Sequence, residues 1–305
     1  MGDVWWPTRC RAVQTFPAGA RLRAARQKAR GRVHNVGILE RLNVRVSGAP
    51  DSPPVMFAHG FGCDQAMWRH VAPAFAPDFR VVLFDHMGCG RSSASSFDPH
   101  DYTSLERYAA DVIDIIEALD LRDVVLVGHS VSAMIGALAT IAAPERFAGL
   151  VMIGPSPRYV DDDSYVGGFT RGDVDEMLQT LESNYLGWSR AMAPVIMDNL
   201  DRPELADELE SSLCCVDPAI ARQFARVTFL SDNRADLSRI SVPTLVVQCE
   251  YDAIASKSVG LYVHQHIAGS EFTVLDVAGH CPNLSAPEQT VEAIRPFVAR
   301  LPLRT

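Results

Sequence analysis

Short apolar runs alternate with longer segments of helical periodicity along most of this chain, and this alternation strongly limits its fold. Helical spacing of apolar residues is present at 104–119, 133–142, 258–266 and 287–301. We interpret the short runs as strands, which cover residues 42–46, 55–58, 80–84, 124–127, 150–153, 244–248 and 272–277. The first of these alternates in polarity, so we expect it to be half buried. Strands that alternate with helices predict an α/β fold with a mostly parallel central sheet flanked by helices.

The alternation stops after residue 156 and resumes near residue 239. Between them, helical periodicity appears four times, at residues 174–185, 188–197, 203–213 and 219–229. Four helices inserted into an α/β pattern predict a lid over the sheet. We therefore expect a first core part at 36–156, a helical lid at 157–238 and a second core part at 239–305.

The charge of the chain is unevenly distributed. The first 39 residues carry eight basic side chains and one acidic one, although the whole chain has a net charge of −9. Residues 1–35 lack the apolar segment of a secretory signal, so we expect a disordered basic extension or an upstream start codon, with a transit peptide as the alternative. The acidic remainder argues against nucleic acid as a partner.

Two further features concern the environment of the protein. No run of eighteen apolar residues is present, which argues against a membrane span. The seven cysteines are scattered without CxxC spacing, so neither a structural zinc site nor a disulfide framework is indicated. These features favour a cytoplasmic protein.

A serine follows one of the predicted strands directly. Residues 128–132 read GHSVS, between the apolar run that ends at residue 127 and a buried helical segment. A serine on such a strand-to-helix turn is the nucleophile elbow of α/β hydrolases, usually G-x-S-x-G. Ser130 is then the nucleophile, and the small Ser132 stands where the pattern has its last glycine.

A serine hydroxyl needs a base, and a base needs an orienting acid. His280 lies just past the last predicted strand, and Asp252 lies just past the strand before it. The carboxyl ends of parallel strands meet at one edge of a sheet, and the order Ser, Asp, His is that of α/β hydrolases. Glu250 and Asp276 are the alternative acids. An aspartate nucleophile, as in dehalogenases, is excluded by Ser130.

The oxyanion of the transition state needs preorganised donors. The residue after the nucleophile, Val131, supplies one backbone N–H. The second is expected from the loop after the strand at 55–58, where residues 59–62 read HGFG, and Phe61 is the natural donor. The alternative interpretation of this loop is a simple flexible turn.

With these motifs in place, the chain over about residues 36–301 resembles the RsbQ-like α/β hydrolases, the family of a bacterial sigma-B regulator. It is also similar to the plant karrikin and strigolactone receptor hydrolases, which carry serine where this chain has Ser132. The segments that look like this family are 60–65 (GFGCDQ), 82–85 (VLFD), 128–136 (GHSVSAMIG), 154–159 (GPSPRY), 167–169 (GGF) and 279–282 (GHCP). Residues 201–204 and 217–224 look closest to the bacterial regulator.

The resemblance implies an α/β-hydrolase fold with a four-helix lid over a small, mostly apolar pocket. Met192 stands where the plant receptors tend to carry phenylalanine, so the ligand need not be the same. The positions that match pocket residues of the family are Phe61, Tyr159, Phe169, Trp188, Met192 and Phe229. Taken from the residues alone, these side chains could equally be ordinary core between lid helices.

Two functions are consistent with these residues. The first is a serine hydrolase that cleaves an ester, lactone or enol-ether-like bond in a small apolar molecule, with no metal and no cofactor because the triad needs none. The second, from the resemblance, is a signalling protein that binds or slowly hydrolyses a small molecule and engages a PAS-domain phosphatase. The complete triad disfavours a purely binding, inactive hydrolase.

Overall fold

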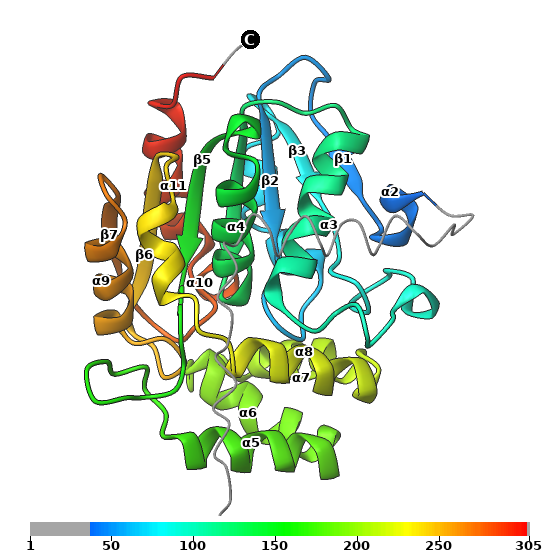
Figure 1. The fold of residues 1–305 in the computed structure, drawn as a ribbon, viewed down its shortest axis with the longest axis vertical. Coiled ribbons are helices and arrows are strands. Elements are labelled where there is room, and N and C mark those ends of the chain that lie inside the picture. Colours follow the sequence, from blue (N-terminus) through cyan, green and yellow to red (C-terminus); the bar gives the residue numbers. More distant parts are fainter. Residues whose placement is uncertain (1–36, 304–305) are drawn as a thin grey trace, which may run out of the picture.

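A computed structural model describes residues 37–303, and its centre is a seven-stranded sheet (Figure 1). β1 pairs antiparallel with β3, and every other neighbouring pair is parallel. In order across the sheet the strands are β1 (Arg45–Ser47), β3 (Arg80–Leu83), β2 (Pro54–Ala58), β4 (Val124–His129), β5 (Phe147–Ile153), β6 (Thr244–Tyr251) and β7 (Glu271–Ala278). The predicted fold class is confirmed. The extension expected at residues 1–35 lies outside the described residues.

Helices cover both faces of this sheet. In Figure 1, α3 (Leu105–Ala118) and α4 (Val131–Ala142) lie in front of the strands, and α11 (Pro287–Ala299) lies behind them. α9 (Lys257–His266) packs on β6 and β7. Strands β2, β4 and β5 are buried along their whole length. This two-sided burial explains why their sequences are continuous apolar runs.

The first strand differs from the prediction of a half-buried strand at 42–46. Leu42 is fully buried, but it caps the short helix α2 (Ile38–Arg41). Asn43 then adopts a left-handed backbone conformation with φ of 47°, which turns the chain. β1 begins only at Arg45, pairs on one side and is exposed at all its residues. The buried Leu42 therefore belongs to the end of a helix. The alternation of apolar and polar residues over 42–46, from which a strand was predicted, does not come from a strand.

Four helices lie between β5 and β6 in the sequence, where helical periodicity was found. They gather at the end of the sheet toward which the arrows of β2 and β5 point (Figure 1). Their bounds are α5 (Arg171–Ser183), α6 (Tyr185–Met197), α7 (Pro203–Cys214) and α8 (Pro218–Phe229). Thr170 and Asp173 form a capping box at the start of α5, and Asp217 caps α8. The carboxyl ends of the strands therefore face helices rather than open solvent.

In the part of the chain from residue 37 to residue 303, none of the helices is long and apolar enough to cross a membrane.

Candidate active site

Ser130 lies on a strained turn between β4 and α4. Its φ is 57° and its ψ is −124°, in the region that residues other than glycine rarely adopt. Its N–H donates to the carbonyl of Ile153, which holds the turn against β5. The turn is tight, because a Cβ on Gly128 would lie 2.3 Å from the carbonyl oxygen of Ser132. This is the geometry expected of a nucleophile elbow.

His280 and Asp252 complete a hydrogen-bonded chain with Ser130. His280 Nε2 lies 2.8 Å from Ser130 Oγ, and His280 Nδ1 lies 2.7 Å from Asp252 Oδ2. The alternative acids lie elsewhere: Glu250 pairs with Lys257, and Asp276 is exposed on β7. The structure thus places the three predicted side chains in the order of a catalytic triad.

The carboxylate of Asp252 is held in its charged form. Burial alone raises its pKa, but the charge and hydrogen bond of His280 outweigh this. The N–H groups of Ile254 and Ala255 also donate to Asp252 Oδ1, at 2.8 and 3.0 Å. The net pKa is therefore below the ordinary value, so the acid is a carboxylate at neutral pH.

Two side chains that the sequence analysis did not assign to the site support it. Gln248 Nε2 donates to Asp252 Oδ2 at 3.2 Å and to the Ala255 carbonyl, so it orients the acid. His129 Nε2 lies 2.8 Å from the His280 carbonyl oxygen, and burial lowers the pKa of His129 to about 3. A neutral His129 donates to that carbonyl. The only sequence signal for Gln248 was an amide at the end of an apolar strand.

The HGFG loop after β2 packs directly against the elbow. A Cβ on Gly60 would lie 2.7 Å from His129 Nδ1 and 3.4 Å from Ser130 Cβ, so only glycine fits there. Val131 is the first residue of α4, where a backbone N–H has no partner within the helix. The two backbone donors predicted for an oxyanion, those of Phe61 and Val131, therefore lie on adjoining segments.

Ser130 and His280 border a cavity of about 50 Å³ at the interface between the sheet edge and helices α5–α8. All six side chains expected to form a pocket line it: Phe61, Tyr159, Phe169, Trp188, Met192 and Phe229. Residues not predicted also contribute, namely Gly60, Cys63, His129, Met177, Ile196, Leu209, Leu213, Thr228, Ile254 and Cys281. The lining is mostly apolar, which suits a small apolar ligand.

Tyr159 lines the same cavity as Ser130. Its side chain is 2% exposed. Burial raises its pKa to about 12, so Tyr159 stays protonated in the cavity.

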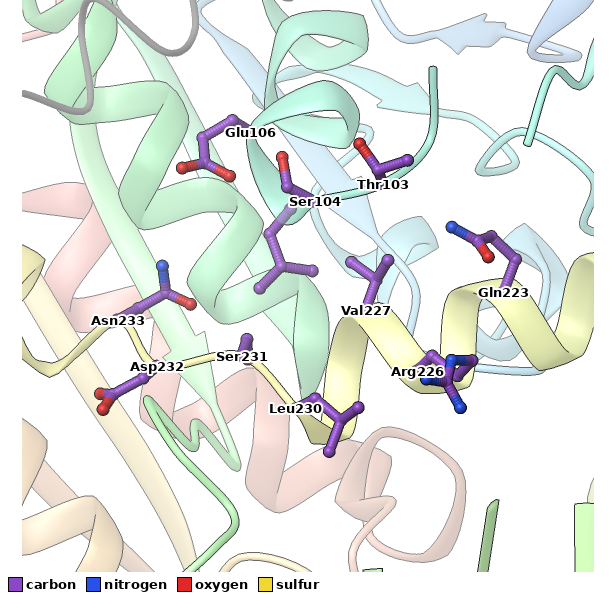
Figure 2. A pocket seen from close by; sticks show the side chains of 11 residues that line it. Thr103, Ser104, Glu106, Gln223, Arg226, Val227, Leu230, Ser231, Asp232 and Asn233 are labelled. Carbon is purple, nitrogen blue, oxygen red and sulfur yellow. The ribbon is translucent and has the colours of Figure 1, made fainter. Parts of the chain in front are cut away.

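A larger hollow of about 390 Å³ lies elsewhere, between the start of α3 and the end of α8 (Figure 2). Polar side chains such as Glu106, Gln223, Arg226 and Asn233 line it, and none of the three triad residues does. Size alone therefore does not identify the reactive site. Within residues 37–303, no group of three or more His, Cys, Asp or Glu side chains is arranged to hold a metal ion.

Comparison with known proteins agrees with this geometry. Residues 55–293 match the alpha/beta hydrolase family. The strigolactone esterase of Arabidopsis thaliana is 39% identical over 269 residues, covering 88% of this chain and 99% of that protein. The karrikin insensitive 2 receptor CA of Petunia hybrida is 38% identical over 261 residues, covering 85% and 96%.

A solved structure is also similar throughout. The hydrolase olei00960 of Oleispira antarctica superposes with a TM-score of 0.84 at 37% identity, covering 88% of this chain and 100% of that one. The predictions of an α/β-hydrolase fold and of an enzyme resembling carboxylic ester hydrolases are confirmed by these matches. The chain belongs to the alpha/beta hydrolase family.

Proposed function

We propose that this protein hydrolyses an ester, lactone or enol-ether-like bond in a small apolar molecule through an acyl-serine intermediate. The observation that carries the proposal is the hydrogen-bonded chain from Asp252 through His280 to Ser130, which ends at an apolar cavity. The names of two similar proteins, an esterase and a hydrolase, support the same reaction type.

The reaction follows from these positions. His280 Nε2 takes the proton of Ser130 as Oγ attacks the carbonyl carbon, and the Asp252 carboxylate stabilises the resulting imidazolium. The N–H groups of Phe61 and Val131 stabilise the oxyanion. His280 then gives its proton to the leaving oxygen, and an acyl-serine remains. Water attacks this ester in a second cycle with the same proton transfers, which releases the acid and restores Ser130.

The cavity constrains the substrate. Its volume of about 50 Å³ is small beside the roughly 300–1,000 Å³ of typical ligand pockets, which favours a small substrate. We propose that helices α5–α8 act as a lid that admits larger molecules by moving away from the sheet. Tyr159 then offers a hydroxyl to the polar atom of a substrate beside Ser130.

The test is to incubate the protein with p-nitrophenyl acetate and to measure product release and intact mass after rapid acid quenching. We expect steady turnover and an adduct of about 42 Da at Ser130, which is the mass gained when an acetyl group replaces a hydrogen. A folded protein that neither turns over this ester nor reacts with a fluorophosphonate probe would contradict the proposed hydrolysis.

A second candidate is a receptor that binds or slowly hydrolyses a small molecule and passes the signal to a protein. The similarity to a protein named as a receptor favours it. A PAS-domain phosphatase in the cytoplasm is the partner that we predict for this case, and the free cysteines at six described positions are compatible with that compartment. Turnover far slower than ligand binding, with partner binding that requires the ligand, would favour the receptor over a metabolic enzyme.

A further inference from the structure

Three buried polar residues from distant segments form a closed hydrogen-bonded ring beneath the elbow, through their side chains and through the backbone N–H of His86 and the backbone carbonyl of His59. His59 follows β2, His86 follows β3, and Ser132 lies in the first turn of α4. All three are at most 1% exposed. His86 N–H donates to His59 Nε2 at 2.9 Å, Ser132 Oγ donates to the His59 carbonyl at 2.5 Å, and His86 Nε2 lies 2.6 Å from Ser132 Oγ.

The direction of every hydrogen bond in this ring is determined. His59 Nε2 accepts a proton, so its own proton is on Nδ1, which donates to the Gly60 carbonyl at 2.8 Å. A carbonyl only accepts, so Ser132 uses its single proton on the His59 carbonyl. Ser132 Oγ must then accept from His86 Nε2–H. Each hydrogen bond of the ring therefore has one possible direction.

Both histidines are neutral, as this arrangement requires. Burial lowers the pKa of His59 below its ordinary value, although nearby carboxylates raise it in part. Burial, and then repulsion from His59, lowers the pKa of His86 further. Neither ring therefore gains a second N–H at neutral pH.

The ring connects the two segments that carry the oxyanion donors. His59 is two residues before Phe61, and Ser132 is the residue after Val131. The HGFG loop already touches the elbow at Gly60, so a shift of a few tenths of an ångström would change the separation of the two N–H groups. Stabilisation of an oxyanion depends on donors at about 2.7–3.1 Å from one point.

We propose that Ser132, held by His86, is a positioning residue that fixes the HGFG loop against the elbow so that the N–H groups of Phe61 and Val131 converge on the oxyanion. This inference rests on the proposed hydrolase function. It explains why a hydroxyl, and not only a small side chain, stands at the last position of the GHSVS motif.

The experiment compares Ser132→Ala with Thr140→Val, which also removes a buried hydroxyl of α4 that donates to a backbone carbonyl, but far from the loop. We measure kcat and KM for p-nitrophenyl acetate, the pH profile of kcat/KM, and the rate of phosphonylation by a fluorophosphonate.

Ser132→Ala should lower kcat and the phosphonylation rate by about 10- to 100-fold with little change in KM. The pH profile should stay unchanged because the triad is intact. Thr140→Val should lose stability to a similar degree with kcat unchanged.

A second pair of variants covers the case in which Ser132→Ala does not fold. His86→Leu removes the donor to Ser132, and His86→Gln keeps an N–H group on a side chain of similar length. We expect His86→Leu to show the same loss of kcat and His86→Gln to recover part of it.

The outcomes separate the inference from the proposed function. An active wild type in which Ser132→Ala and His86→Leu match Thr140→Val in kcat would overturn the positioning role alone. A loss of kcat with a shifted pH profile would also overturn it, since the defect would then lie in the triad. A folded but inactive wild type would remove the proposed hydrolysis and this inference together.

Discussion

Two serine–histidine pairs lie side by side at the sheet edge, and they differ in the direction of their hydrogen bonds. Ser130 and His280 are 2.8 Å apart, and Ser132 and His86 are 2.6 Å apart. By distance alone, Ser132 would be expected to be the nucleophile rather than Ser130. The difference lies in where each proton is held.

In the first pair the histidine can accept. Asp252 Oδ2 accepts a hydrogen bond from His280 Nδ1–H, so Nε2 is free to receive the proton of Ser130, whose hydroxyl borders the cavity. In the second pair Ser132 already donates to the His59 carbonyl, and His86 must itself donate. This difference in proton direction is why we propose Ser130, and not Ser132, as the nucleophile.

Removal of each serine hydroxyl gives the largest expected contrast. Ser130→Ala should lower kcat by about 10⁴-fold or more and abolish fluorophosphonate labelling, because no nucleophile remains. Ser132→Ala should still label, though more slowly. Gel fluorescence with the probe measures both. Labelling of Ser130→Ala at the wild-type rate would show that another residue is the nucleophile.

Asp252→Asn should make His280 more like His86, which cannot accept a proton from its serine. The amide cannot hold the tautomer of His280 in which Nε2 accepts, so kcat should fall by about 10³- to 10⁴-fold. The matched control is Asp276→Asn on exposed β7, which should have wild-type kcat. Equal effects of the two substitutions would exclude Asp252 as the orienting acid.

Acid should destabilise the second pair. The pKa of His86 is lowered in the folded state, so below a pH of about 6.5 the unfolded state binds more protons than the folded state. Stability is then lost as the pH falls from this value toward the folded pKa, at about 1.4 kcal/mol per pH unit for one proton. His86→Gln should reduce this slope of unfolding free energy, measured by urea denaturation between pH 7 and pH 5, and exposed His70→Gln should not.

Enlargement of the cavity should change the acyl-chain preference of the reaction at Ser130 and His280, because this pair borders the cavity. Phe229 borders it, whereas the buried Phe75 packs on Phe57 and Phe79 and does not line it. Phe229→Leu should raise the rate on p-nitrophenyl butyrate relative to acetate by about 10-fold, and Phe75→Leu should leave this ratio unchanged. The kcat/KM ratio of the two esters is the measurement. The same ratio in both variants would place the acyl group outside this cavity.

The sheet and the placement of three site residues could be predicted from local patterns. Buried parallel strands are recognisable as apolar runs, and residues just past their carboxyl ends meet at one edge, as Ser130, Asp252 and His280 do. The edge strand β1 was misplaced because it is exposed and lacks that signal. The bounds of the separate parts of the chain remain a prediction.

The supporting contacts could not be predicted from the sequence. The ring of His59, His86 and Ser132 depends on two loops and a helix that meet only after folding, and each residue alone resembles an ordinary polar residue. Gln248 was included in a strand, and its amide gains meaning only beside Asp252. The cavity volume depends on how far α6 and α8 approach the sheet, which no periodicity encodes.

The loop that carries Gly279 and His280, here called the histidine loop, packs against the end of α6. This contact links the position of the base to the position of the helix. The N–H of His280 donates to the carbonyl of Ile196 at 2.8 Å, and a Cβ on Gly279 would lie 1.9 Å from the carbonyl oxygen of Met197. In the lid movement that we propose, a shift of α6 away from the histidine loop would break this backbone bond. His280 would then be less constrained while the cavity is open, and closure of α6 would restore its position. Substrate entry and the placement of the base would in this way be coupled.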